Sequence, residues 1–174
     1  MIGYTAGITA GESLVSNSSR TSRRVLLGGA AIAVVGSARA QTSDDPAQLL
    51  AIMERYAAGL RWGTADALVT LFTSDGVFIR DNLPAAAGTE ALRAAYRQVF
   101  ATLKLDLAFE IKETEMAADM AWLRATSKGR VKTLASGVEA AESFNDVVIF
   151  RRTAAGWKIR CYIYNASKGA GIPQ

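Results

Sequence analysis

The sequence contains no histidine and only one cysteine among its 174 residues. Ser-His-Asp catalysis, Cys-His catalysis and nearly all common zinc sites are therefore excluded, because each depends on an imidazole. A single cysteine also excludes a disulfide framework within the chain. The sequence lacks a glycine-rich phosphate loop, a dinucleotide fingerprint and carboxylates at metal-binding spacing. We therefore expect no metal and no cofactor.

Net charge is small over most of the sequence. The formal charge is +4, but the residues after position 40 comprise 16 basic and 15 acidic side chains. A nearly neutral domain has no electrostatic footprint for nucleic acid or for an anionic membrane. Half of the residues are hydrophobic and only three are proline, which is typical of one globular domain. The composition thus predicts no nucleic-acid partner.

Residues 1–40 are predicted to be an export signal. The pair Arg23-Arg24 precedes an apolar run, Val25–Gly36, that is too short to span a bilayer. Ala38-Arg39-Ala40 then forms a small-x-small cleavage site, which predicts cleavage after Ala40. The paired arginines are similar to those of twin-arginine (Tat) signals. An ordinary Sec leader and a retained short membrane anchor are the alternatives.

With a cleaved signal, residues 41–174 are expected to form a single domain, with a core at about 47–166. The predicted location of this domain is the periplasm or the exterior of the cell. No stable insertion into the membrane is expected after cleavage.

Helical spacing dominates the first part of this domain. Asp44-Asp45-Pro46 predicts a helix start, and the helix is expected to end near Trp62-Gly63. Thr64 is expected to cap a short second helix, and Gly88-Thr89-Glu90 to open a third. Between these two helices, a turn at Ser74-Asp75-Gly76 and a short strand at Val77–Arg80 are predicted, with a break at Asp81–Pro84.

After residue 103 the apolar spacing changes to two, which predicts four strands. Turns are expected at Ala118-Asp119 and at Ala154-Ala155-Gly156. In the last strand, the inward row is expected to be Trp157, Ile159, Cys161 and Ile163. The order predicts an α+β domain in which three N-terminal helices pack on one face of a strongly curved antiparallel sheet. Such a sheet leaves a cone-shaped cavity suited to a small molecule.

Several stretches resemble the SnoaL-like branch of the nuclear transport factor 2-like superfamily, which includes ketosteroid isomerase. The matching stretches are Arg55–Leu60, Ala67–Asp75, Gly88–Arg93, Phe150–Arg152, Gly156–Ile159 and Tyr162–Asn165. The likeness covers about residues 47–166 and is greatest to the SgcJ/EcaC-type group. It implies a cone fold and a homodimer formed through the sheet face.

The resemblance also implies three candidate catalytic residues: Tyr56, Asp81 and Asp146. Ketosteroid isomerase uses a carboxylate base and an oxyanion hole made of a tyrosine and a protonated aspartic acid. Tyr56 matches the tyrosine. The base position falls on Arg80, with Asp81 one residue later, and the acid position falls on Val148, with Asp146 two residues earlier. Only one of the three groups is retained, so the standard isomerase mechanism is not expected.

The resemblance directs Arg124 and Asp146 into the cavity, either as a structural ion pair or as a clamp for a polar ligand. The other residues expected to bind a ligand are Trp62, Phe78, Arg80, Trp122, Tyr164 and Asn165. Cys161 is expected to be a small buried hydrophobe.

Three functions follow as hypotheses. The first is an exported domain that binds a small hydrophobic or polyketide-like molecule in its cone. The second is a cofactor-free isomerase, cyclase or hydratase, with Tyr56 as oxyanion donor and Asp81 or Asp146 as base. The third is a non-catalytic dimeric interaction module.

Overall fold

The computed structural model describes residues 44–167. The predicted export signal and its cleavage site lie outside the described residues, so both stay predictions. Within the described range, no helix is long and apolar enough to cross a membrane.

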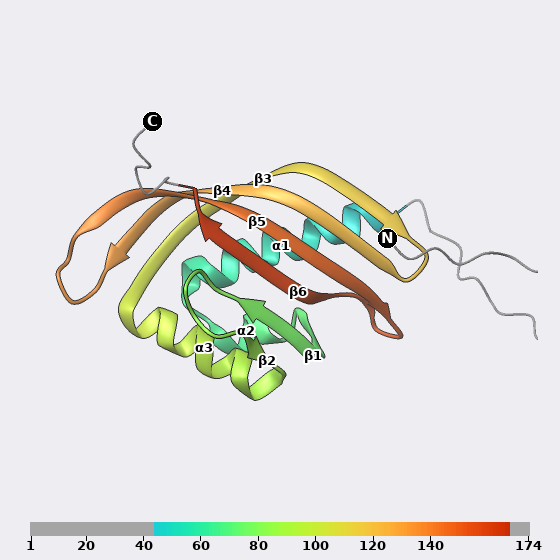
Figure 1. The fold of residues 1–174 in the computed structure, drawn as a ribbon, viewed down its shortest axis with the longest axis horizontal. Helices are drawn as coiled ribbons and strands as arrows, with labels where there is room; N and C mark the ends of the chain where they lie inside the picture. The colour runs from blue at the N-terminus through green and yellow to red at the C-terminus, as the bar shows by residue number, and fades with distance from the viewer. Residues whose placement is uncertain (1–43, 168–174) are drawn as a thin grey trace, which may run out of the picture. The chain divides into compact units, whose positions relative to one another are not determined.

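Helices come first and long strands last, in the predicted order (Figure 1). One short strand, β2, was not expected. The elements are α1 (Asp45–Trp62), α2 (Ala65–Val69), β1 (Phe72–Ile79), β2 (Ala86–Ala87), α3 (Thr89–Thr102), β3 (Leu103–Ala117), β4 (Met120–Thr133), β5 (Glu139–Thr153) and β6 (Gly156–Ala166).

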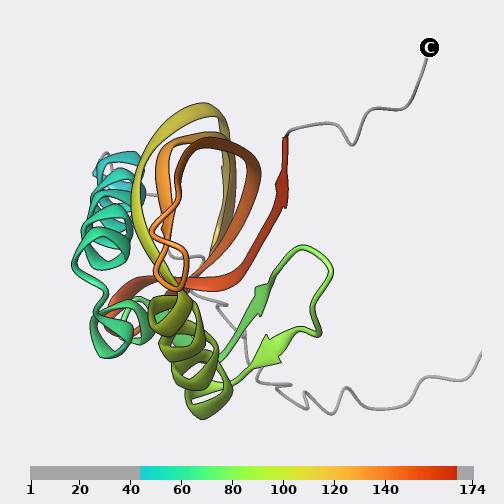
Figure 2. The ribbon, with the colours of Figure 1, turned by 90° about the vertical axis from the view of Figure 1, so that its left-hand side faces the viewer.

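The strands form one sheet in the order β2-β1-β6-β5-β4-β3. All neighbours are antiparallel except β1 and β6, which run parallel. The helices packed on a strongly curved sheet are confirmed, but the sheet is mixed, because the expected antiparallel pairing fails for β1 and β6. β1 and β6 can run parallel because α3 and four strands separate them in the chain. The long strands curl around the side on which α1 and α3 pack (Figures 1 and 2).

Helix α1 has the bounds that the local signals predict. Pro46 lies in its first turn, and Gly63 ends it with a left-handed backbone at φ +65°, donating its N–H to the carbonyls of Gly59 and Leu60. The buried face of α1 includes Leu49, Ile52, Met53, Tyr56 and Leu60. A Cβ at Gly59 would lie 2.5 Å from a methyl carbon of Leu68, so glycine permits the close approach of α1 and α2.

A β-bulge in β6 changes which residues face the core. Phe150 pairs with Ile159, but the neighbouring Ile149 pairs with Cys161, so Arg160 is an extra residue. Beyond Arg160 the alternation is inverted: Tyr162 is 4% exposed, whereas Ile163 is 37% exposed. The expected inward row is therefore correct for Trp157 and Ile159 and wrong for Cys161 and Ile163.

A register shift also lies between Phe72 and Val77 of β1. The sequence Ser74-Asp75-Gly76, expected as a turn, is part of this irregular strand. The strand is consequently longer than the predicted Val77–Arg80.

A buried polar cluster joins the start of α1 to the β5–β6 hairpin. The side chains of Asp45 and Arg152 are 1% and 11% exposed and form an ion pair. The Trp157 indole Nε1 donates a hydrogen bond to Asp45 Oδ1 at 3.2 Å. The Arg152 guanidinium lies 4.5 Å from the centre of the Trp157 ring. This cluster ties together residues more than 100 positions apart.

Candidate functional site

A cavity of about 130 Å³ lies between the helices and the curved sheet. Its walls come from α1, α3, β1, β3, β4, β5 and β6. The lining residues are Tyr56, Leu60, Phe78, Tyr96, Val99, Leu103, Leu105, Leu107, Ser127, Val131, Phe144, Tyr162 and Tyr164. No charged side chain is among them, and most are aromatic or aliphatic. A cavity of similar size in another protein, lined by apolar side chains, holds one benzene ring.

Contacting aromatic rings form much of the cavity wall. Phe78 stacks on Tyr96 and on Tyr162, with ring centres 4.8 Å and 5.5 Å apart. Tyr56 meets Tyr162 edge to face at 4.9 Å. Such ring pairs contribute about 0.5–1.5 kcal/mol each beyond their buried area, so this wall is expected to be rigid.

The hydroxyl of Tyr56 is buried and already has a partner. It lies 2.8 Å from the hydroxyl of Tyr96, and either oxygen can be the donor. Burial, with the nearby Tyr96 and Tyr162, raises the pKa of Tyr56 well above its usual value. Burial likewise raises the pKa of Tyr96. Both phenols are therefore neutral, and the pair keeps one O–H hydrogen that is not used between them.

Asp146 is a buried carboxyl whose two oxygens differ. The residue is 1% exposed, and its Oδ1 accepts a hydrogen bond from the Tyr162 hydroxyl at 2.6 Å. Within the described part of the chain, neither Asp146 Oδ2 nor Ser127 Oγ has a hydrogen-bond partner, although both atoms are buried. Burial raises the pKa of Asp146, while Tyr162 and Ser127 oppose the shift. The Asp146 side chain thus lies behind the cavity wall formed by Tyr162 and Ser127.

The raised pKa of Asp146 predicts a pH dependence of stability. The folded protein keeps the proton of this carboxyl to higher pH than the unfolded chain, whose ordinary value is 3.8. The free energy of unfolding should therefore fall as the pH rises from about 3.8 through the folded pKa. Asp146→Asn stays neutral and should lack this loss, so it gains stability relative to the native protein between acid and neutral pH. Urea unfolding at a series of pH values measures the difference.

Asp75→Asn is the control, because a hydrogen bond from Thr73 lowers the pKa of exposed Asp75. Its stabilising contribution is present at neutral pH and is lost on acidification, which is the opposite direction. Parallel stability curves for Asp146→Asn and the native protein would contradict the assignment of a buried, neutral-favouring carboxyl.

Arg124 and Trp122 do not line the cavity, which corrects the expectation for both. The Arg124 side chain is 53% exposed and pairs with Glu113, with Arg124 Nε 3.2 Å from Glu113 Oε2. The Trp122 indole donates to Glu115 at 3.3 Å. Alternation along β4 directs Leu123, Ala125 and Ser127 inward instead, and Ala125 rather than Arg124 lies opposite Asp146. Arg124 and Asp146 therefore form neither an ion pair nor a clamp.

Trp62 and Asn165 also lie away from the cavity. Trp62 is 79% exposed at the end of α1, because it comes six positions after Tyr56 and so lies on another face of the helix. Asn165 is exposed, and its side chain donates to the carbonyl of Ala166.

Asp81, Arg80, Phe78 and Tyr164 lie near one another. Phe78 and Tyr164 line the cavity, with ring centres 5.8 Å apart. Arg80 holds its guanidinium carbon 5.9 Å from the Phe78 ring centre. Asp81 is exposed after β1 and does not line the cavity, but its charge adds to the raised pKa of Tyr164, which Arg80 opposes. A role for Asp81 as a base stays a prediction.

Three cavity residues that carry a hydroxyl were not predicted as site residues: Tyr96, Ser127 and Tyr162. Tyr96 lies at helical spacing from Leu92 and Val99, so its position carried a usable signal. Tyr162 was hidden by the bulge at Arg160, which inverts the alternation. Ser127 was hidden because small polar residues occur on both faces of strands.

The sequence matches the SnoaL-like domain family over residues 49–164. Among curated proteins, no sequence matches this chain. A ketosteroid isomerase-like protein from Erwinia carotovora atroseptica is 28% identical, with a TM-score of 0.69, covering 73% of this chain and 99% of that one. A nuclear transport factor 2-like protein with a cystatin-like fold from Novosphingobium aromaticivorans is 24% identical, with a TM-score of 0.59, covering 74% and 85%. A conserved protein from Planctomyces limnophilus is 22% identical, with a TM-score of 0.61, covering 72% and 99%.

Helices packed on a curved sheet around an apolar cavity define a nuclear transport factor 2-like domain. The chain belongs to the SnoaL-like domain family, as the match over residues 49–164 shows. The finer placement in the SgcJ/EcaC-type group stays a prediction. The outer sheet face exposes Val147 and Ile163, each by 37%, and the homodimer expected through this face also stays a prediction.

Proposed function

We propose that this domain binds a small, largely apolar molecule about the size of one ring in the cavity under the sheet. The observation that carries the proposal is the cavity of about 130 Å³, lined by aromatic and aliphatic side chains with Ser127 as its small polar group. Ligand pockets characteristically combine apolar walls with a few placed polar groups. The SnoaL-like fold is consistent with small-molecule binding or with isomerase-like activity.

The size of the cavity narrows the class of ligand. Volumes of about 150 Å³ hold benzene, whereas drug-sized ligands occupy about 300–1,000 Å³. A multi-ring polyketide would therefore require the packed rings of Phe78, Tyr96 and Tyr162 to separate. The proposal accordingly favours a single-ring molecule over the polyketide-like ligand suggested by the resemblance.

Benzene is the simplest probe of this proposal. A concentration about tenfold above its dissociation constant should raise the Tm of the native domain by about 4 °C, because only the folded state binds. Val131→Phe adds a ring to the cavity wall and should abolish this increase. The measurement is thermal unfolding by circular dichroism with and without benzene.

Val138→Phe is the matched control, because Val138 is 62% exposed between β4 and β5. It makes the same substitution away from the cavity and should keep the full increase. An unchanged Tm of the native protein in benzene, or an equal increase in Val131→Phe, would overturn the proposal.

A further inference from the structure

Ser127 and Asp146 give one part of the cavity region hydrogen-bonding groups that the aliphatic walls lack. Ser127 is 1% exposed and is the only lining residue among those described that has an aliphatic hydroxyl. Its Oγ has no hydrogen-bond partner, and the same is true of Asp146 Oδ2. The two residues lie on paired strands, with Ser127 opposite Phe144 and therefore diagonal to Asp146. The Ser127 oxygen therefore has lone pairs at the cavity wall that no described group uses, which indicates a place for a ligand atom.

Asp146 determines how the Ser127 hydroxyl can be used. When Asp146 is ionised, its carboxylate only accepts hydrogen bonds, and Oδ1 already accepts from the Tyr162 hydroxyl. The Ser127 hydroxyl hydrogen can rotate toward this carboxyl, whose charged form the Ser127 side chain stabilises. The lone pairs of Ser127 Oγ are then left for the cavity. In this arrangement the serine presents an acceptor, and the carboxylate behind it strengthens that acceptor.

The charges near the cavity further restrict the class of ligand that it can bind. Among the residues that line it, none is a lysine or an arginine, so an anionic ligand would face the carboxyl of Asp146 without a counter-charge. Arg80 lies outside the lining, but its charge acts on Tyr96 and Tyr164, which are cavity walls. A cationic ligand would therefore lie near the positive charge of Arg80.

We infer that the cavity selects a neutral single-ring molecule whose polar group donates a hydrogen bond, received by Ser127 Oγ with Asp146 behind it. This inference rests on the proposed function, because it assigns the chemical class of ligand for the same cavity. Rings with an N–H or O–H group belong to this class. Rings whose polar atom only accepts gain no hydrogen bond from Ser127.

Pyrrole, pyridine and benzene test the inference, because they have similar size and differ in polarity. Pyrrole donates, neutral pyridine accepts, and benzene does neither. Titration calorimetry at about pH 8, where pyridine is neutral, should show pyrrole binding about tenfold more tightly than pyridine to the native domain. Pyridine binding as tightly as pyrrole would overturn the inference.

Two variants separate the role of Asp146 from that of Ser127. In Asp146→Asn, the amide oxygen can still accept from Tyr162 while the NH₂ group donates to Ser127 Oγ, so the serine hydrogen turns into the cavity. The preference should then reverse in favour of pyridine. Ser127→Ala removes the polar wall and should bring the two affinities within about twofold of each other. An unchanged tenfold preference for pyrrole in either variant would contradict the inference.

Benzene distinguishes failure of the inference from failure of the proposed function. Equal benzene affinity in the native protein and both variants shows that the cavity is intact. If the native protein binds benzene but does not prefer pyrrole to pyridine, the proposed function stands and the inference fails. If the native protein binds none of the three probes, both the proposed function and the inference fail. If Asp146→Asn does not fold, the comparison of Ser127→Ala with the native protein still decides the outcome.

Discussion

Replacing Asp45 with alanine is expected to destabilise the domain by about 3–5 kcal/mol. The change removes the carboxylate that pairs with Arg152 and accepts from the Trp157 indole. The Arg152 side chain is only 11% exposed, so its charge would remain buried without this counter-charge. Leaving one partner of a buried pair uncompensated costs far more than the pair itself contributes. Urea unfolding followed by circular dichroism measures the loss.

The exposed pair of Arg61 and Asp106 is the control. Its atoms Arg61 Nε and Asp106 Oδ1 are 2.7 Å apart, but the side chains are 52% and 61% exposed. Asp106→Ala should therefore cost less than about 1 kcal/mol. The double variant Asp45→Ala with Arg152→Leu should recover part of the stability, because no charge is then left buried. Equal losses for Asp45→Ala and Asp106→Ala would show that the cluster is not buried as described.

Gly129→Ala is expected to destabilise the domain by about 3 kcal/mol. A Cβ at Gly129 would lie 1.9 Å from the carbonyl oxygen of Asp106 and 2.9 Å from its carbon. Both are backbone atoms of the neighbouring β3, so the strands must move apart where Leu107 pairs with Gly129. Chemical unfolding of the purified variant measures the effect.

Gly137→Ala is a matched control between β4 and β5. Gly137 has φ +70°, but nothing lies within 4 Å of an added Cβ. Only the left-handed backbone then opposes the substitution, at a cost of about 1–2 kcal/mol. A larger loss for Gly137→Ala than for Gly129→Ala would contradict the close approach of β3 and β4.

Local signals predicted the helices, because their information lies within a few residues. Pro46 and Gly63 mark the ends of α1, and the spacing of its apolar residues marks its buried face. The parallel pairing of β1 with β6 was missed because its partners, such as Phe78 and Tyr162, are far apart in sequence. Nothing in either strand alone specifies the direction of its neighbour.

The candidate site was predicted only in part, because alternation does not say which face of a strand is inside. In β4, both rows contain large apolar residues, and the sequence favoured Trp122 and Arg124 over Leu123 and Ala125. In β6, one extra residue, Arg160, moved Tyr162 into the core. Asp146 was expected in the cavity region, but its hydrogen bond to Tyr162 could not be read from the sequence.

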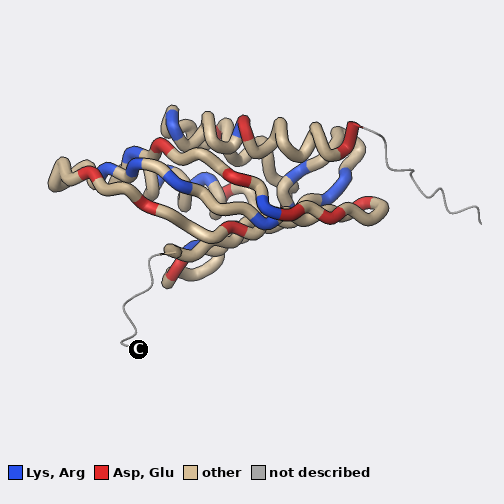
Figure 3. The backbone as a smooth tube through the Cα atoms, turned by 90° about the horizontal axis from the view of Figure 1, so that it is seen from above, with Lys and Arg blue, Asp and Glu red and all other residues tan. Residues whose placement is uncertain are grey.

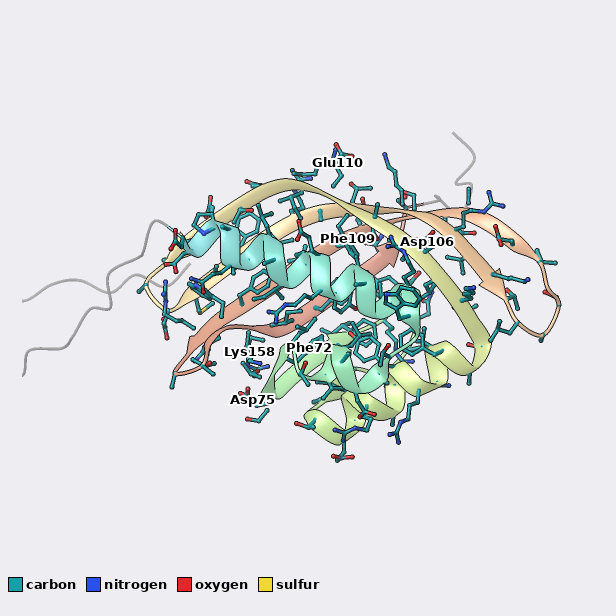
Figure 4. All side chains as sticks on the ribbon, turned by 180° about the vertical axis from the view of Figure 1, so that it is seen from behind. Phe72, Asp75, Asp106, Phe109, Glu110 and Lys158 are labelled. Carbon is teal, nitrogen blue, oxygen red and sulfur yellow. The ribbon has the colours of Figure 1, made fainter. Side chains whose placement is uncertain are left out.

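Charged side chains on the outside of the sheet are simpler to place. Figure 4 shows Glu110 of β3, which points away from the domain. Acidic and basic residues are mixed along the backbone (Figure 3), as the near-neutral composition predicts.

The pairing of β1 with β6 has a consequence for the order in which the chain can fold. β1 ends at Ile79, whereas its parallel partner begins only at Gly156. Arg152 and Trp157, which hold Asp45, also come late in the chain. During synthesis, β1 must therefore wait for the last strand before its edge facing β6 can be paired. A chaperone that shields the early segments would act during this interval, and a chain stopped before β6 would expose the rings that otherwise enclose the cavity.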